Sequence, residues 1–421
     1  MKRKTLGSLL LITLVASLLV PSRAQTFSVI HAFDGKNGAN PIAGLTTRDG
    51  ILYGTTAYRD IRHFGGSVYQ ITRVESEWIT MPIFFFPTDG SGGTTPEARV
   101  VFGPDGLLYG TTAEGGIGNG SGVAFHLAPP PPVCSTTNCS WSEDVLHAFQ
   151  GAPDGYQPGL GDLVWDSMGS IYGTTQWGGS SERGTVYQMT KSGDQWTETP
   201  IYSFKGDSNP EELDGSQPYG GVIVDDNGNL FGTTVGGGLY GGGTIFELTY
   251  VDDVGWTETI LHSFQDLSDG RAPVAALFRD SMGNLYGTAT DGGAGGGGTL
   301  FELSPIGNGW TFTVLYSFAG QPGMYCGPYA TLTVDNSGSF YDTTYCGGAN
   351  NLGSVFRLTN TQNDWQYTSL HDFTGGSDGE YPISGVTFDK DGNLYGTAEV
   401  GGTPTFLCGY GGCGTVWMIK P

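Results

Sequence analysis

Short segments in which hydrophobic and polar residues alternate recur along the chain, separated by glycine-rich polar segments. In one such unit, residues 221–224 form an apolar run and residues 225–228 read Asp-Asp-Asn-Gly. Asn-Gly supplies the positive φ angles of a tight hairpin turn. Residues 230–234, 243–248 and the alternating segment 256–264 follow. The pattern predicts four antiparallel strands in this unit.

The second strand of the unit carries a motif that returns seven times. Its copies cover residues 51–56, 108–112, 171–175, 228–234, 285–289, 340–344 and 394–398. Their aromatic residues lie at 53, 109, 172, 231, 286, 341 and 395, so the steps are 56, 63, 59, 55, 55 and 54 residues. Such a period fits one four-stranded blade per repeat. The chain is therefore predicted to be an all-β, seven-bladed β-propeller.

The repeats also predict how the ring closes. Third strands begin at Gly residues 66, 122, 184, 243, 298, 353 and 414, whereas only six fourth strands end in Phe, at 86, 149, 204, 264, 318 and 373. The missing copy resembles residues 27–33 near the N-terminus. We expect this strand to complete the last blade by pairing with residues 414–419. Closure of this kind removes open sheet edges.

The first 24 residues have the three parts of a secretory signal peptide: a basic start, an apolar run over residues 6–20, and small residues before Ala24. We expect cleavage after Ala24 and one propeller domain over residues 25–421. The mature chain is expected to have no membrane span, to be a monomer, and to be secreted or periplasmic.

Charge limits the partners. The chain has 41 Asp and Glu against 18 Lys and Arg, a formal net charge of −23. Removing residues 1–24 takes away four basic residues and no acidic one. Such an acidic surface repels nucleic acid and anionic lipid. Nucleic acid is therefore not an expected partner.

A core of the form Gly-Asn-Leu-Tyr-Gly-Thr-Thr, a following Gly-Gly pair and a Gly-Thr-Val-Phe strand make the chain similar to the GloVer tandem-repeat family of exported bacterial proteins. The resemblance covers nearly the whole mature chain. It implies an exported repeat protein, supports the propeller, and brings no established activity and no catalytic residues.

Six cysteines in an exported chain indicate disulfides. Cys326 and Cys346 flank a two-strand hairpin, so we expect them to face each other. Cys134 with Cys139, and Cys408 with Cys413, would close short loops. Other pairings remain open, and a metal site at the thiols is the alternative, although no histidine cluster accompanies them.

Four histidines, His31, His147, His262 and His371, occupy one repeat position, two residues before the Phe that ends the fourth strand. Such recurrence favours a structural role, so no catalytic residue and no metal ligand is assigned. No cofactor is expected, with calcium at the acidic turns 225–229 and 389–393 as the alternative.

Ligand contacts must break the symmetry of a repeat. The loops after the second and fourth strands should share one face of the ring, here called the top rim. On it, the loops after the second strands of blades 4 and 5 are mostly glycine, whereas those of blades 1, 3 and 7 carry aromatic and charged residues. The residues expected to bind a ligand are Tyr58, Arg59, Asp60, Arg62, His63, Trp177, Arg183, Glu399, Phe406 and Tyr410.

Aromatic residues beside hydrogen-bonding charged groups suit a glycan or an extracellular protein. The sequence thus favours a noncatalytic binding or scaffold propeller. Variable loops without a ligand would instead fit a structural component of the cell envelope. The main alternative is a carbohydrate-active hydrolase or lyase, with Asp60 and Glu399 as its carboxylate pair and Arg59, Arg62 or His63 assisting.

Overall fold

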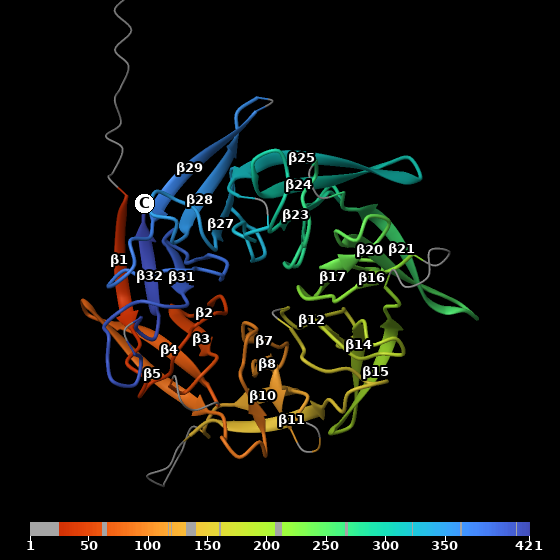
Figure 1. The fold of residues 1–421 in the computed structure, drawn as a ribbon. Coiled ribbons are helices and arrows are strands. Elements are labelled where there is room, and N and C mark those ends of the chain that lie inside the picture. The colour runs from red at the N-terminus through yellow and green to blue at the C-terminus, as the bar shows by residue number, and fades with distance from the viewer. Residues whose placement is uncertain are drawn as a thin grey trace, which may run out of the picture.

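The computed structural model describes residues 25–60, 65–116, 118, 120–131, 140–159, 161–206, 213–265, 268–321, 323–362, 364–409 and 411–421. Seven four-stranded antiparallel sheets form the blades of a ring around a central channel (Figure 1). The predicted seven-bladed, all-β propeller is confirmed. Among the described residues, no helix is long and apolar enough to cross a membrane. The expected signal peptide lies outside the described residues.

Within each blade the strands follow one another outward from the channel. The innermost strands of blades 1 to 7 are β2 (Thr46–Arg48), β7 (Val101–Phe102), β12 (Val164–Trp165), β17 (Val222–Val224), β22 (Phe278–Arg279), β26 (Thr333–Val334) and β30 (Thr387–Phe388). The second strands, which carry the repeated motif, are β3 (Ile51–Thr56), β8 (Leu108–Thr112), β13 (Ile171–Thr175), β18 (Leu230–Thr234), β23 (Leu285–Ala289), β27 (Phe340–Thr344) and β31 (Leu394–Ala398).

The third and fourth strands are longer. The third strands are β4 (Ser67–Val74), β10 (Val123–Ala128), β14 (Thr185–Ser192), β20 (Thr244–Val251), β24 (Gly296–Ile306), β28 (Ser354–Asn360) and β32 (Thr415–Lys420). The outermost strands are β5 (Glu77–Phe85), β11 (Ser142–Ala148), β15 (Gln195–Ser203), β21 (Gly255–Ser263), β25 (Gly309–Ala319), β29 (Trp365–Asp372) and, for blade 7, β1 (Thr26–Ala32). Two small sheets lie in the loops, β6 (Gly93–Thr94) with β9 (Glu114–Gly115), and β16 (Gly215–Ser216) with β19 (Gly236–Gly237).

The ring closes as the sequence predicts. Strand β1 pairs antiparallel with β32, from Thr26 opposite Lys420 to Ala32 opposite Thr415. Figure 1 shows the red N-terminal strand beside the blue C-terminal strand. The backbone N–H of Phe33 then donates to the carbonyl of Gly414 at 3.0 Å. Both ends of the chain are thus held in one blade.

The Gly-Thr-Thr motif joins blades as well as strands. Its first threonine reaches the next blade, since Thr233 Oγ1 donates to the carbonyl of Ala275 at 2.9 Å, and Thr397 Oγ1 to that of Ala43 at 3.1 Å. The second threonine stays in its own blade, where the Thr234 and Thr244 hydroxyls lie 2.8 Å apart. In these copies the motif satisfies buried polar groups and has a structural role, although the hydroxyls of Thr111, Thr174 and Thr288, the first threonines of three other copies, have no hydrogen-bond partner among the described residues.

The hairpin aspartates also act within the scaffold. One carboxylate oxygen of Asp225 accepts the backbone N–H groups of Asn227 and Asn229, each at 2.9 Å. Asp389 accepts the equivalent N–H groups and, through its other oxygen, the Tyr395 hydroxyl at 2.9 Å. These bonds stabilise the turn without an ion, and calcium at the turns stays a prediction.

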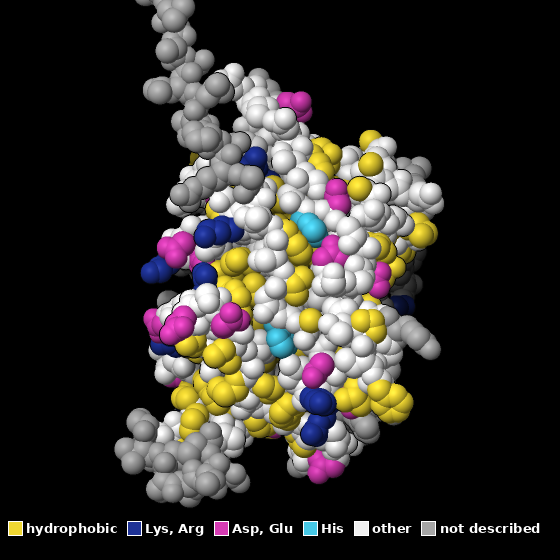
Figure 2. Space-filling model, turned by 90° about the vertical axis from the view of Figure 1, so that its left-hand side faces the viewer, with side chains coloured by type: hydrophobic (Ala, Val, Ile, Leu, Met, Phe, Trp, Pro, Cys, Tyr) yellow, Lys and Arg dark blue, Asp and Glu magenta, His cyan; other side chains and the backbone are white. Residues whose placement is uncertain are grey.

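The hydrophobic core lies between neighbouring blades. The phenylalanine that ends or follows each fourth strand is almost fully buried in every blade, as are the aromatic residues of the third strands: Phe33, Phe86, Phe149, Phe204, Phe264, Phe318, Phe373, Tyr69, Phe125, Tyr187, Phe246, Phe301, Phe356 and Trp417. Figure 2 shows the outer side of blades 7 and 1, where hydrophobic side chains lie between scattered charged ones. On the side of the molecule shown in Figure 2, neither positive nor negative side chains form a continuous patch.

Two of the three expected disulfides fall on described residues, and both are present, Cys326–Cys346 and Cys408–Cys413. Cys134 and Cys139 lie outside the described residues. Disulfides form and persist in oxidising compartments. The chain is accordingly an exported protein.

Candidate ligand-binding site on the top rim

An X-Pro step in each repeat shapes the top rim. In six blades the residue before the proline has a positive φ angle: Asn40, Thr95, Gln157, Gln217, Ala272 and Tyr381. The N–H of Gln157 donates to the carbonyl of Ser121 at 2.9 Å, and its carbonyl accepts the N–H of Gln176 at 3.0 Å. This costly backbone conformation ties the innermost segment to the loop after the second strand.

The blades differ in the residue pair that lies next to this rim residue, one position further from the proline. Tyr156 and Trp177 form a two-residue antiparallel bridge in blade 3, with backbone hydrogen bonds of 3.1 and 3.3 Å. The equivalent pair is Arg271 and Asp291 in blade 5, where Arg271 Nε donates to Asp291 Oδ2 at 2.7 Å. In blade 6 it is the disulfide Cys326–Cys346. Among these three blades, only blade 3 has two aromatic residues at this bridge position.

A groove of about 1270 Å³ opens beside this aromatic pair. It is lined by the loops after the fourth strands of blades 1 and 2 and by those after the second strands of blades 2 and 3. This confirms that the two kinds of loop share one rim. Besides Tyr156 and Trp177, the groove contains the side chains of Gln150, Glu114 and Arg183. The Arg183 side chain packs over Gly206.

Acidic residues also gather where the channel meets the rim. Glu97 lines the channel, and burial, followed by the nearby carboxylates of Glu114 and Glu399, raises its pKa to about 7. The same three carboxylates and burial raise the pKa of Tyr58. Glu114 extends this cluster to the groove, since it accepts the Thr95 hydroxyl at 3.4 Å and also lines the groove.

The channel itself is narrow, with a cavity of about 130 Å³. Arg99 of blade 2 extends into it, and its Nε donates to Asp162 Oδ2 of blade 3 at 2.9 Å. The remaining lining is mostly small or apolar. The rim, rather than the channel, thus offers room for a large ligand.

The structure divides the predicted ligand residues among three places. Trp177 and Arg183 line the groove, whereas Tyr58 and Glu399 belong to the acidic cluster at the channel mouth. Arg59 lies over the Phe85 ring, 5.2 Å from its centroid. Arg62, His63 and Tyr410 lie outside the described residues.

The last two predicted residues differ sharply in exposure. Asp60 is buried, with 7% of its surface exposed, whereas Phe406 is 79% exposed on the loop that carries Cys408. That loop is held against the closing strand, because Thr405 Oγ1 donates to the carbonyl of Asp34 at 3.1 Å.

The carboxylate pair of the enzyme hypothesis, Asp60 and Glu399, stays a prediction. Glu399 accepts a hydrogen bond from the Asn40 side chain, and burial raises its pKa. The carboxylates that lie close to Glu399 at the channel mouth include Glu97 and Glu114.

Reasoning from the sequence missed Glu97, Glu114, Gln150 and Tyr156. A signal for Glu97 was present, because the residue after the rim proline is Ile42, Val274 or Ile383 in three other repeats. An acid at this apolar position departs from the repeat. Gln150 and Tyr156 lie in the loop after a fourth strand, whose length and composition vary from blade to blade. We find no comparable signal for them.

Two overlapping segments, residues 66–255 and 250–421, match the Gloeobacter/Verrucomicrobia repeat. The chain belongs to this family. The membership covers most of the described propeller and agrees with the family resemblance of the repeated motif. Among curated proteins, none matches the sequence.

Solved structures share the fold. The extracellular domain of a hybrid two-component system from B. thetaiotaomicron is 12% identical, with a TM-score of 0.51; the match covers 94% of this chain and 41% of that one. An ulvan lyase, a polysaccharide lyase, is also 12% identical, with a TM-score of 0.52 over 90% of each chain. The chain thus spans less than half of the first protein. At such identities these similarities describe the fold alone.

Proposed function

We propose that this protein is a noncatalytic binding propeller that works outside the cytoplasm, in the periplasm or as a secreted protein, and holds a glycan chain in the top-rim groove. The observation that carries the proposal is the placement of Tyr156 and Trp177 side by side at an open groove of about 1270 Å³. Pockets for small ligands usually measure roughly 300–1,000 Å³ and enclose their ligand. A larger open groove suits a chain molecule that enters and leaves at its ends.

The groove offers both kinds of contact that a sugar needs. Aromatic rings provide flat apolar surfaces for the C–H faces of sugar rings, while their polar edges still reach water. Gln150, Gln157 and Arg183 provide amide and guanidinium groups for sugar hydroxyls.

The charge of the groove favours one class of glycan. Asp89, Glu114 and Glu182 line it together with one described cation, Arg183. An excess of carboxylates repels uronic acids and sulfated sugars. Neutral or amino sugars are therefore the proposed ligands.

The proposal can be tested on a glycan array with the wild-type protein and two variants. Trp177→Ala should abolish or strongly reduce the wild-type signals, because truncating a buried aromatic contact usually costs about 2 kcal/mol or more, roughly 30-fold in affinity. Tyr240→Ala is the matched control, since Tyr240 is 55% exposed on the equivalent loop of blade 4 and does not line the groove. Equal signals from Trp177→Ala and wild type would reject the groove as the site.

A carbohydrate-active enzyme is the second candidate, and one observation favours it. Glu97, with a pKa of about 7, lies in an acidic cluster with Glu399 beside Tyr58. An acid tuned near neutral pH is a property of general acids. An assay of reducing ends released from each bound polysaccharide separates the two functions. Product formed by wild type and not by Glu97→Gln would establish catalysis.

A further inference from the structure

The boundary between consecutive blades contains one repeated side-chain pair on the outer strands. One member lies two residues before the phenylalanine of the fourth strand, and the other lies two residues after the position of the repeated tryptophan in the next blade. In two boundaries the pair is a histidine stacked on a phenylalanine. His262 stacks on Phe312 with ring centroids 3.8 Å apart, and His371 stacks on Phe27 at 3.5 Å.

At each of these two boundaries an aspartate also contacts the histidine. His262 Nε2 lies 2.8 Å from Asp269 Oδ2, and His371 Nε2 lies 3.1 Å from Asp378 Oδ2. Each aspartate follows its histidine by seven residues. A histidine that pairs with an aspartate is thus part of the scaffold at these two boundaries, where an aromatic ring covers one face of the imidazole.

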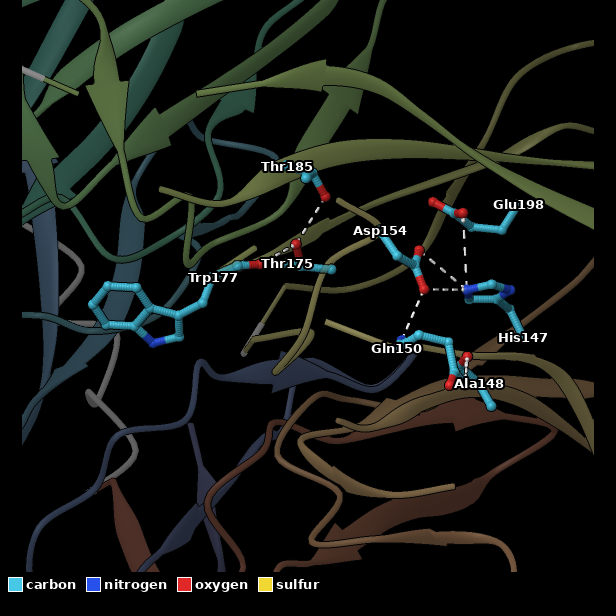
Figure 3. A network of polar contacts seen from close by, with 8 residues as sticks. All are labelled: His147, Ala148, Gln150, Asp154, Thr175, Trp177, Thr185 and Glu198. Atoms are coloured by element: carbon cyan, nitrogen blue, oxygen red, sulfur yellow. Dashed lines mark hydrogen bonds and ion pairs between the residues drawn. The ribbon is translucent and has the colours of Figure 1, made fainter. Parts of the chain in front are cut away.

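The boundary between blades 2 and 3 has the same histidine and aspartate but replaces the ring with a carboxylate. His147 Nε2 lies 3.0 Å from Asp154 Oδ2 and 3.8 Å from Glu198 Oε2 (Figure 3). The three ligand atoms all lie within 4.8 Å of one another. Between blades 3 and 4 the acids Asp214 and Glu258 are kept, but Tyr202 takes the place of histidine. Among the described residues, only this group of His, Asp and Glu has the spacing of a metal site.

The contacts of Glu198 within the protein do not account for the burial of a carboxylate at this position. Its side chain is 4% exposed, and its Oε1 has no hydrogen-bond partner among the described residues. A buried carboxylate oxygen without a hydrogen-bond partner is costly. In Figure 3 its carboxylate group lies next to the His147 ring, and its Oε2 is the atom 3.8 Å away from Nε2. A positive ion between these groups would offset this cost.

We propose that His147, Asp154 and Glu198 form a binding site for a divalent transition-metal ion of the Zn²⁺ class. One imidazole nitrogen and two carboxylates are ligands that Zn²⁺ accepts, usually in a four-coordinate arrangement. Calcium fits less well, because it takes six to eight oxygen ligands. His147 and Asp154 are 24% and 16% exposed, so water can reach the fourth position.

The site also adjoins the groove. Asp154 Oδ2 accepts the backbone N–H of Gln150 at 2.8 Å, and Gln150 lines the groove. The ion would therefore bind at the base of a groove loop. Its binding does not depend on whether the groove holds a glycan.

Binding must compete with protons. All three proposed ligands bind a metal ion in their deprotonated forms. Because the metal takes the ionised carboxylate, Zn²⁺ binding should release a proton and weaken as the pH is lowered.

The test is calorimetric titration of Zn²⁺ into the purified full chain after dialysis against a chelator, with excess Ca²⁺ present to occupy unspecific acidic sites. We expect one tight equivalent per chain and proton release, measured by comparing buffers of different ionisation enthalpy. Co²⁺ absorption provides an independent report of nitrogen and oxygen ligation.

Two variants and one control decide the outcome. Glu198→Phe installs the residue that two other boundaries use at this position, and Glu198→Gln keeps the shape of the side chain. Each should weaken Zn²⁺ binding at least tenfold, whereas His262→Ala, at a boundary without the glutamate, should leave it unchanged. Absence of tight Zn²⁺ binding in wild type, or equal affinity in a folded Glu198 variant, would overturn the proposal in favour of a proton shared between Asp154 and Glu198.

Discussion

At the scale of single residues, the same repeat position carries different chemistry in different blades. The sequence grouped His31, His147, His262 and His371 in one repeat position and predicted a structural role for all four. The sequence could not show that His147 and His262 have different neighbours, because the residue that distinguishes them, Glu198 or Phe312, belongs to the next blade. Only the register between neighbouring blades brings each pair together.

Buried acids should make stability depend on pH. Burial, followed by the charge of Asp214, raises the pKa of Glu258 from about 4.5 to about 8, and its Oε1 has no partner among the described residues. The unfolded chain releases this proton at lower pH than the folded chain does. The free energy of unfolding should therefore fall as the pH rises from about 4.5 to about 8.

Glu258→Gln removes this dependence. The variant should be more stable than wild type at pH 8, by up to about 4 kcal/mol for a pKa raised from about 4.5 to about 8, and should have no such advantage near pH 4.5. Urea unfolding of both proteins at the two pH values measures the difference. Since Glu198 titrates in both proteins, the comparison isolates Glu258. A difference that does not change with pH would contradict the assignment.

Asp342 is the second residue that breaks the repeat at a buried position. Six blades have glycine there, and a Cβ at Gly232 would lie 2.6 Å from Phe246 Cζ. Asp342 is fully buried, its Oδ2 has no partner among the described residues, and burial raises its pKa.

Replacing Asp342 by the glycine of the other blades should stabilise the protein at pH 7, by about 1 to 3 kcal/mol, the usual cost of an unsatisfied buried polar group. The reciprocal change, Gly232→Asp, should destabilise it by about 3 kcal/mol or more, because it adds a crowded and unpaired charge. Thermal unfolding checks both. A loss of stability in Asp342→Gly would show that blade 6 uses the carboxyl.

At the scale of elements, the sequence predicted the strands well because their pattern repeats seven times and every hairpin turn between the first and second strands contains a glycine. The segment 221–224 became β17 (Val222–Val224), and residues 256–264 became most of β21 (Gly255–Ser263). Loops were predicted less well. The pairing of Tyr156 with Trp177 joins two loops whose path depends on contacts between blades, and composition does not encode it.

The closing strand makes a direct prediction at this scale. A chain that begins at residue 34 lacks β1 and leaves β32 as an open edge, so it should unfold at lower temperature and self-associate through that edge. Light scattering and thermal unfolding measure both effects.

A circular permutant provides the control for this truncation. It places residues 25–33 after Pro421 through a short linker and restores the blade, so it should remain monomeric. A truncated chain that stays monomeric and equally stable would show that the closing strand is dispensable.

At the scale of the whole molecule, the ring is nearly regular and its rim is not. The scaffold positions repeat around the ring, whereas the groove and the His147 cluster both involve blades 2 and 3. The acidic channel mouth combines Glu97 and Glu114 of blade 2 with Glu399 of blade 7. The sequence predicted an irregular rim at blades 1, 3 and 7. The groove includes the predicted loop of blade 3, but its other sides are the loop after the second strand of blade 2 and the loops after the fourth strands of blades 1 and 2.

The central claim is that the aromatic pair in this groove binds a glycan. The most direct measurement is a calorimetric titration of the strongest array ligand into wild type and into the double variant Tyr156→Ala/Trp177→Ala. Loss of two stacking contacts should weaken binding about 100-fold or more, with the fold unchanged by circular dichroism. Affinities within twofold of each other would contradict the claim.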